Sequence, residues 1–253
     1  MRRKTTFLIV LGLSLLCAPP APAAELSAKE IVRRSDDLMR GDTNQGTYRM
    51  TVTTPAWQRE LKLSVTAVGR DRTFIRILSP AKEAGIGTLR IGNEMWNYLP
   101  AVEKTIKIPP SMMLQPWMGS EFSNDDLVKE SSLVDDYTHQ IIDQGVYDGH
   151  RILKIELRPK PGAPVIWGRI LRWIRADDYV PLKESYFGDN GDLVKILTFS
   201  DIGPVSDRKI PRVWTMTSQI RPGHQTVIRL LDVRYNQPVD PDVFTLTHLK
   251  KIQ

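Results

Sequence analysis

The sequence predicts a mainly β protein of the α+β class, built on a single large curved antiparallel sheet that forms an open or half β-barrel. Three observations support this prediction. Runs of alternating apolar and polar residues, separated by turn signals, fill most of the chain. One amphipathic segment precedes them, and one apolar connector interrupts them. We therefore expect an N-terminal helix and a helical lid over the concave face of the sheet.

The first 24 residues have the pattern of a secretory signal peptide. Arg2, Arg3 and Lys4 precede an apolar run at residues 7–16, and small residues follow at 18–24. The apolar run is about half the ~20 residues that a membrane-spanning helix needs. We therefore predict a signal peptide at residues 1–24, a periplasmic location, and one domain at residues 25–253.

Cys17 leaves a second possibility for this segment. A cysteine directly after an apolar run can be the lipidated residue of a lipoprotein, although Leu16 occupies a position where such signals normally have a small residue. With ordinary cleavage the mature chain has no cysteine, because Cys17 is the only one in the sequence. A soluble mature form and a form anchored through Cys17 both stay open.

The first folded element is predicted to be a helix that begins at Ser27. Ser27 and Glu30 have the spacing of a capping box, in which the hydroxyl accepts from an amide three residues on and the glutamate reaches back. Gly41 provides a C-terminal stop. The residues of the expected buried stripe are Ala28, Ile31, Ser35, Leu38 and Met39.

After this helix the hydrophobic period changes to two. Residues 61–67 alternate in this way, as do Tyr48, Met50 and Val52 before them. The further strands are predicted at residues 74–78, 151–158, 165–175, 181–187, 193–201, 211–220 and 226–235, with hairpin signals at 92–94, 100–104, 145–149 and 188–192. We expect about a dozen strands in one consecutive meander, which curls because neighbouring strands twist.

Residues 109–130 break this rhythm. The segment is very apolar for a connector, and Ser123 and Asp126 again have capping-box spacing before Leu127 and Val128. We predict a short helix or helical loop here that covers the mouth of the curled sheet.

The sequence shows no pattern typical of catalysis or of a bound cofactor. The four histidines (His139, His150, His224 and His248) have no metal-ligand spacing, and adjacent acidic pairs such as Asp177-Asp178 are typical of turns and helix starts. Nucleophile-elbow, P-loop and Rossmann motifs are absent from the sequence. Removing Arg2, Arg3 and Lys4 lowers the formal charge from +6 to +3, without a concentrated basic stripe. We predict a protein that is not an enzyme, has no metal or cofactor, and binds no nucleic acid.

Large apolar side chains are the more informative feature. Tryptophan and methionine together number 14, and methionine is an adaptable filler suited to flexible apolar ligands. Period-two spacing places Trp167, Leu171 and Trp173 on one face of their strand, and Trp214 with Met216 on one face of theirs. An ordinary core would use the same residues. The predicted lining of an apolar cavity and its lid comprises Trp96, Tyr98, Met112, Met113, Trp117, Met118, Trp167, Trp173, Trp214 and Met216.

Several motifs resemble a known family. They lie at residues 95–100, 108–113, 117–127, 178–184, 195–199 and 243–246. The sequence resembles the LolA-like family of outer-membrane lipoprotein-sorting proteins, in the LolA/LolB superfamily, over essentially the whole mature chain. The resemblance implies a curved antiparallel sheet that is closed over by helices and encloses an apolar cavity for lipid chains. In the lipoprotein carrier of that superfamily, a basic residue near the start of the sheet helps to control the lid. Arg49 and Arg59 lie in a comparable region, but no local motif fixes the equivalence, so this role is assigned to neither.

The function expected from these features is that of a periplasmic carrier or chaperone. It would bind acyl chains of lipoproteins or lipids during transfer toward the outer membrane, as a monomer, with an inner-membrane transporter and an outer-membrane acceptor as partners. The alternative is a non-enzymatic accessory protein that docks on a membrane transporter, with the Trp/Met segment as an exposed anchor.

Overall fold

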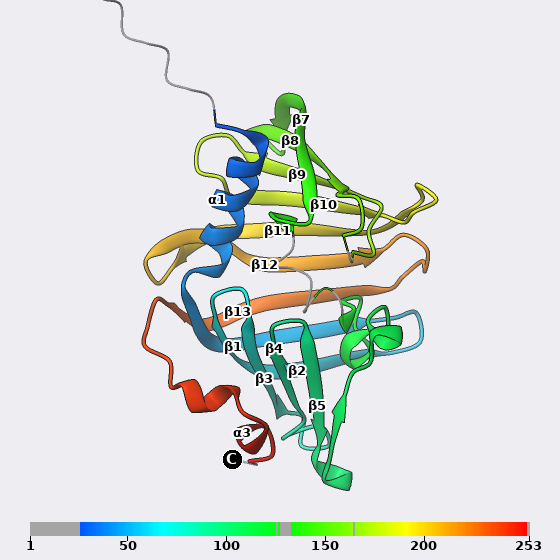
Figure 1. Cartoon of the computed structure of the whole chain (residues 1–253), viewed down its shortest axis with the longest axis vertical. Coiled ribbons are helices and arrows are strands. Elements are labelled where there is room, and N and C mark those ends of the chain that lie inside the picture. Colours follow the sequence, from blue (N-terminus) through cyan, green and yellow to red (C-terminus); the bar gives the residue numbers. More distant parts are fainter. Residues whose placement is uncertain (1–25, 125, 127–132, 164, 252–253) are drawn as a thin grey trace, which may run out of the picture.

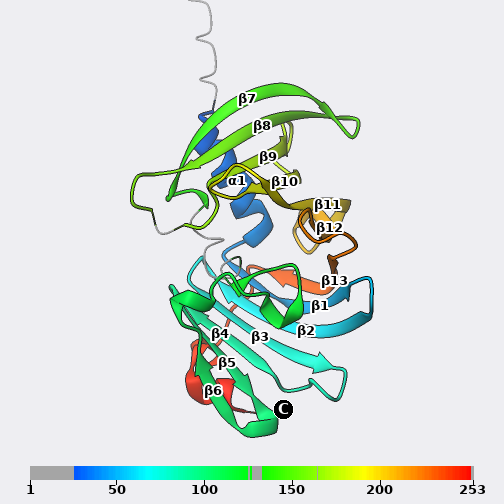
Figure 2. The ribbon, with the colours of Figure 1, turned by 90° about the vertical axis from the view of Figure 1, so that its right-hand side faces the viewer.

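The computed structural model describes residues 26–124, 126, 133–163 and 165–251. The predicted signal peptide, Cys17, and the expected helix at Leu127 and Val128 lie outside these residues. In the described chain, thirteen antiparallel strands form one curved sheet, as predicted. Figure 2 shows the sheet curling around the N-terminal helix α1, which lies on its inner side.

The elements follow one another along the chain with short connections. The first half contains α1 (Ala28–Arg40), β1 (Thr43–Thr53), β2 (Gln58–Val68), β3 (Arg72–Ser79), β4 (Gly87–Ile91), β5 (Glu94–Leu99) and β6 (Lys104–Lys107). The second half contains β7 (Tyr137–Tyr147), β8 (His150–Pro159), β9 (Arg169–Arg175), β10 (Pro181–Phe187), β11 (Leu193–Val205), β12 (Arg208–Ser218), β13 (Gln225–Tyr235) and α3 (Leu246–Leu249). Short 3₁₀ turns are η1 (Pro100–Val102), η2 (Pro110–Met112), η3 (Trp117–Gly119) and η5 (Pro241–Phe244).

The strand order differs from the single consecutive meander expected from the sequence. It runs β6-β5-β4-β3-β2-β1-β13-β12-β11-β10-β9-β8-β7, so β1 and β13 are neighbours in the middle and β6 and β7 are at opposite edges. The chain winds outward from the centre to β6, resumes at the opposite edge with β7, and winds back; the crossing segment between them is residues 108–136, of which 108–124, 126 and 133–136 are described. This crossing segment is therefore long because it connects the two edges of the sheet (Figures 1 and 2).

Helix α1 begins as the sequence predicts and differs in one detail. The Ser27 hydroxyl accepts from the Glu30 amide at 3.2 Å, and Gly41 ends the helix with a positive φ. The Glu30 carboxylate accepts from the guanidinium groups of Arg33 and Arg34 instead of reaching back. The apolar stripe faces the sheet, with Ile31 and Ser35 buried. The two guanidinium groups, instead of the backbone amide at the start of the helix, are therefore the donors to the Glu30 carboxylate.

The inner face of the sheet carries two apolar clusters: one is built mainly on strands of the first half together with β13, and the other mainly on strands β7–β12 of the second half together with α1. Met50 and Leu61 are among the fully buried residues of the first half, and Ile155 and Ile170 of the second. Trp214 packs against both clusters. The apolar residues of a wide sheet thus meet across its curvature instead of forming one flat layer.

The outer face is covered at one end by the C-terminal segment. Phe244 and Leu249 pack on Phe74, Leu89 and Tyr98 of β3–β5. Beneath them the Arg76 guanidinium donates to the carbonyl oxygens of residues 85 and 249, at 2.8 and 3.0 Å. This cover is small, so it buries the outer face of β3–β5 and leaves the curvature of the sheet unchanged.

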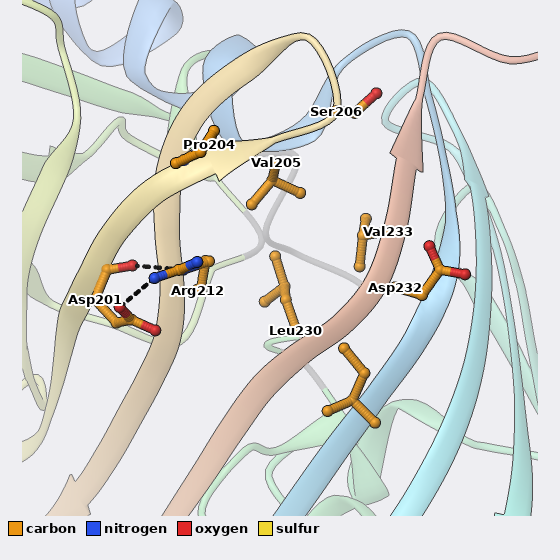
Figure 3. Close-up of a pocket in the computed structure, with 9 residues that line it drawn as sticks. Asp201, Pro204, Val205, Ser206, Arg212, Leu230, Asp232 and Val233 are labelled. Atoms are coloured by element: carbon orange, nitrogen blue, oxygen red, sulfur yellow. Dashed lines mark hydrogen bonds and ion pairs between the residues drawn. The ribbon is translucent and has the colours of Figure 1, made fainter.

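Strand β13 is paired over different lengths with its two neighbours, β1 and β12. β13 pairs with β1 from Asn44 to Thr53, whereas β12 pairs with β13 over the five positions 213–217. Beyond this point the strands separate, and a pocket of about 390 Å³ opens between the β11–β12 hairpin and β13 (Figure 3). There Arg212 donates to the Asp201 carboxylate at 2.6 Å (Figure 3). β13 is therefore paired over a long register with β1 of the first half and over a short register with β12 of its own half.

The close approach of β1 and β13 gives a first testable prediction. A Cβ at Gly46 would lie 2.7 Å from the Cα of Val233, whereas a Cβ at Gly145 in β7 would meet nothing within 4 Å. Gly46→Ala should therefore reduce the free energy of unfolding by about 1–3 kcal/mol or more, because the backbone must shift. Gly145→Ala is the matched control in urea denaturation. Equal stability of the two variants would contradict this role for the β1–β13 contact.

Candidate functional site

A cavity of about 220 Å³ lies on the inner face of the sheet. Its walls come from α1, from β1–β3 of the first half, from β7 and β9–β13 of the second half, and from the crossing segment. The apolar residues that line it are Met39, Leu63, Val65, Ala67, Ile75, Trp117, Phe122, Leu133, Trp167, Leu197, Phe199, Trp214, Met216 and Ile228. The cavity thus lies where the two apolar clusters meet, in the space that α1 and the crossing segment do not fill.

Four of the ten predicted lining residues border this cavity. Trp214 and Met216 point inward from β12, as their period-two spacing predicts, and the Trp214 ring lies 6.4 Å from that of Tyr48. Trp117 lies in the crossing segment, with its indole nitrogen donating to the Thr88 hydroxyl at 3.1 Å. The fourth residue is Trp167, just before β9.

Three other predicted residues lie elsewhere on the sheet. Trp96 and Tyr98 belong to the outer cluster of β3–β5, next to the C-terminal segment. Trp173 in β9 contacts the ammonium groups of Lys154 and Lys183, 5.0 and 4.8 Å from its ring. The prediction that Trp167 and Trp173 share a strand face is wrong, because β9 begins at Arg169 and its inward positions are the even-numbered ones.

The three predicted methionines of the crossing segment have different environments. Met113 and Met118 pack against the first-half cluster, whereas Met112 is 44% exposed. Leu114, which was not among the predicted residues, is 62% exposed. The described part of this segment contains the 3₁₀ turns η2 and η3 joined by loops, and Asn124 and Asp126 are helical, whereas the rest of the helix expected before Leu127 and Val128 lies outside the described residues.

Arg59 connects the sheet to the crossing segment. Its guanidinium donates to the carbonyl oxygen of Met118 and pairs with Glu83 at 3.2 Å. Arg49, the other basic residue in this region, pairs instead with Glu60 at 3.3 Å. Of the two arginines singled out in the sequence, Arg59 contacts the crossing segment, and Arg49 pairs with a residue of β2.

A buried ion pair lies at one side of the cavity. Arg172 of β9 and Glu184 of β10 are directly opposite in register and 2.7 Å apart, and each is 3% exposed. The Tyr186 hydroxyl donates to the same carboxylate. Burial acts to lower the pKa of Arg172, and the carboxylates of Glu184 and Asp36 outweigh it, so this pKa is raised. Arg172 is therefore charged throughout the working pH range.

A second buried pair lies next to the first. Lys195 of β11 pairs with Asp126, and its ammonium is 4.6 Å from the Trp167 ring and 5.1 Å from the Tyr186 ring. Burial, followed by the charge of Glu184, raises the pKa of Tyr186 well above its ordinary value. Tyr186 thus remains a neutral hydroxyl donor. The two ion pairs leave this side of the cavity polar but electrically balanced.

The sequence analysis missed these charged residues, although the sequence contains a signal for them. Arg172 lies between Ile170 and Ile174 on the inward face of β9, and Glu184 lies between Leu182 and Tyr186 on that of β10. A single charge within an apolar period-two face marks a buried polar position. Trp173 lies in the opposite phase of β9, so the spacing of the tryptophans predicts the wrong inward face for this strand.

Two further findings bear on the kind of site. In the described ranges, groups of three or more His, Cys, Asp or Glu side chains that could hold a metal ion do not occur. Across the same residues, helices are too short or too polar to cross a membrane. The cavity and its buried charges are therefore the feature to compare with known proteins.

A family model described as that of an uncharacterized protein matches residues 69–251. The chain belongs to this family. No curated protein matches the sequence. The solved structures that it resembles include a domain from Vibrio parahaemolyticus that is provisionally described as an outer membrane lipoprotein-sorting protein, with 22% identity, a TM-score of 0.77, and coverage of 88% of this chain and 98% of that one.

Two other solved structures agree with this match. A LolA superfamily protein from Nitrosomonas europaea has 19% identity and a TM-score of 0.75, and the match covers 88% of this chain and all of that one. A DUF1329 family protein from Desulfovibrio piger has 23% identity and a TM-score of 0.78, with 88% and 97% covered. The chain has the LolA-like fold, which confirms the resemblance seen in the sequence.

The buried ion pair gives a second prediction, about stability. Arg172→Met leaves the Glu184 carboxylate buried without its partner and should lower the free energy of unfolding by about 3–5 kcal/mol. Arg172→Met combined with Glu184→Gln removes both charges and keeps an acceptor for the Tyr186 hydroxyl, so it should recover most of that loss. Chemical denaturation measures both variants. A double variant as unstable as the single one would refute the uncompensated-charge explanation.

Proposed function

We propose that this protein is a periplasmic carrier or chaperone that shields acyl chains of lipoproteins or lipids during transfer toward the outer membrane. The observation that carries the proposal is the apolar cavity on the inner face of a LolA-like sheet. A structurally similar domain is itself provisionally described as a lipoprotein-sorting protein. The predicted signal peptide supports the location. In this function the protein acts as a monomer without enzymatic activity, between an inner-membrane transporter and an outer-membrane acceptor.

The energetics favour an acyl chain as the occupant. Each buried methylene group contributes about 0.8 kcal/mol of transfer free energy, so a long chain can be held strongly without a specific polar contact. Aromatic walls such as Trp167, Phe199 and Trp214 provide this apolar surface. The cavity of about 220 Å³ is smaller than typical ligand pockets of roughly 300–1,000 Å³. A complete long chain therefore requires the walls to move apart.

Blocking the cavity tests this function. Val65 of β2 lines the cavity, and its neighbour Thr66 alternates to the other face. Val65→Trp should reduce bound acyl lipid about tenfold, because displacing about two methylene groups from the cavity forgoes ~1.6 kcal/mol and 1.4 kcal/mol is a factor of ten. Thr66→Trp is the matched control. Native mass spectrometry and lipid extraction, on protein purified from its own cell envelope, provide the measurement.

Two results would refute the carrier function. One is the persistent absence of acyl lipid from wild-type protein purified in this way. The other is equal lipid content in Val65→Trp and wild-type protein, which would place the lipid outside the cavity.

A second candidate function rests on the exposed apolar residues of the crossing segment. Met112 and Leu114 face solvent, and methionine is enriched at the centres of protein interfaces. The protein would then be an accessory that docks on a membrane transporter through this segment. The two functions differ in which residues they require.

Site-specific cross-linking in intact cells separates these functions. A photoreactive residue at position 112 or 114 should capture a membrane protein if the segment is a docking anchor, and one at Trp173 on the outer face serves as the control. Cross-links of equal yield at all three positions, or absent from all of them, would argue against the accessory function.

A further inference from the structure

Arg172 is buried at the cavity wall with part of its hydrogen-bonding capacity unused. Its side chain pairs with Glu184 through Nη2. Among the residues that the structure describes, Nε and Nη1 have no hydrogen-bond partner, and both are shielded from solvent. Buried donors without partners are costly and uncommon in folded proteins. Arg172 lines the cavity, so a bound molecule can bring an acceptor to these two nitrogen atoms when the walls move apart, as a long chain requires.

The charge balance around Arg172 specifies the kind of acceptor. Glu184 already compensates its positive charge, and Asp126 compensates that of Lys195. Asp36 of α1 lines the same cavity and is itself paired with two arginine side chains, at 3.3 and 2.8 Å. Each of these cations therefore already has a carboxylate partner, and an additional anion would compete with those carboxylates. A neutral oxygen acceptor satisfies the donors without this competition.

The apolar wall next to Arg172 specifies the rest of the ligand. Trp167, Phe199 and Met216 line the same cavity and can contact an alkyl chain. The ligand must therefore combine a long apolar chain with a neutral carbonyl oxygen near one end. Acyl esters and amides have this chemistry, whereas alkyl ethers lack the carbonyl and free fatty acids are anionic.

We propose that Arg172 binds the carbonyl oxygen of an ester- or amide-linked acyl chain through Nε and Nη1. The site thereby selects acyl esters and amides over ether-linked chains and over free fatty acids. This inference rests on the proposed carrier function and adds the chemical class of its ligand. Arg172 determines specificity, and the apolar walls provide most of the affinity.

A matched pair of ligands tests this selection in the wild-type protein. 1-Decanoylglycerol and 1-O-decylglycerol differ in the carbonyl group alone, and decanoate is the anionic comparison. Binding is followed through the fluorescence of the tryptophans at the cavity wall. We expect the ester to bind about tenfold more tightly than the ether and than decanoate, since hydrogen bonds to charged donors are among the stronger ones.

Variants locate the effect at Arg172. Arg172→Met combined with Glu184→Gln should bring the ratio of ester to ether affinity close to one, with folding checked by circular dichroism. Trp173→Phe, on the outer face of the same strand, should retain the wild-type ratio. Arg172→Lys keeps the positive charge but lacks the planar guanidinium fork, so it should lower the ratio of ester to ether affinity. This variant replaces the double variant in the test if the double variant does not fold.

The outcomes separate the two proposals. Equal affinity of the wild-type protein for ester and ether would overturn the carbonyl site and leave the carrier function standing. Tighter binding of decanoate than of the ester would overturn it in favour of an anion site. Binding of none of the three ligands would overturn the carrier function itself.

Discussion

The inner face of the sheet is apolar and wider than the elements that cover it. Two clusters of buried side chains meet across the curvature, and α1 together with the crossing segment covers them incompletely. Packing elsewhere in the sheet is dense, with side chains such as Met50 and Ile155 fully buried. The cavity is therefore a consequence of geometry: a curled sheet cannot fill the space above its own centre with its own side chains.

The charged residues at the cavity wall follow from strand register. Arg172 and Glu184 lie opposite each other on adjacent strands, and Lys195 lies opposite Tyr186 on the next pair. Arg172 therefore has its ionic partner on the adjacent strand, whereas Lys195 obtains its partner, Asp126, from the crossing segment. Replacing such pairs by apolar residues is often neutral or stabilising, so stability alone does not explain them. Their position beside an apolar cavity favours a role in recognition.

Local features of this fold could be predicted from the sequence, and long-range ones could not. The bounds of β10 and the N-cap of α1 follow from period and capping residues, which act within a few positions. The separation of β6 and β7 to opposite edges leaves no local trace, because periodicity does not specify a neighbour. For the site, the alternation of residues correctly predicts that Trp214 and Met216 face the cavity. The same rule gives the wrong face for Trp173, because the inward positions of β9 are the even-numbered ones.

The position of β1 in the middle of the sheet has a consequence for the order of folding. One edge of β1 pairs with β2, which follows it directly, and the other pairs with β13, about 180 residues later in the chain. Until β13 is present, β1 exposes an unpaired edge that another chain can join. The sheet therefore closes last at its centre, and the slowest and most aggregation-prone interval of folding ends when Gln225–Tyr235 docks.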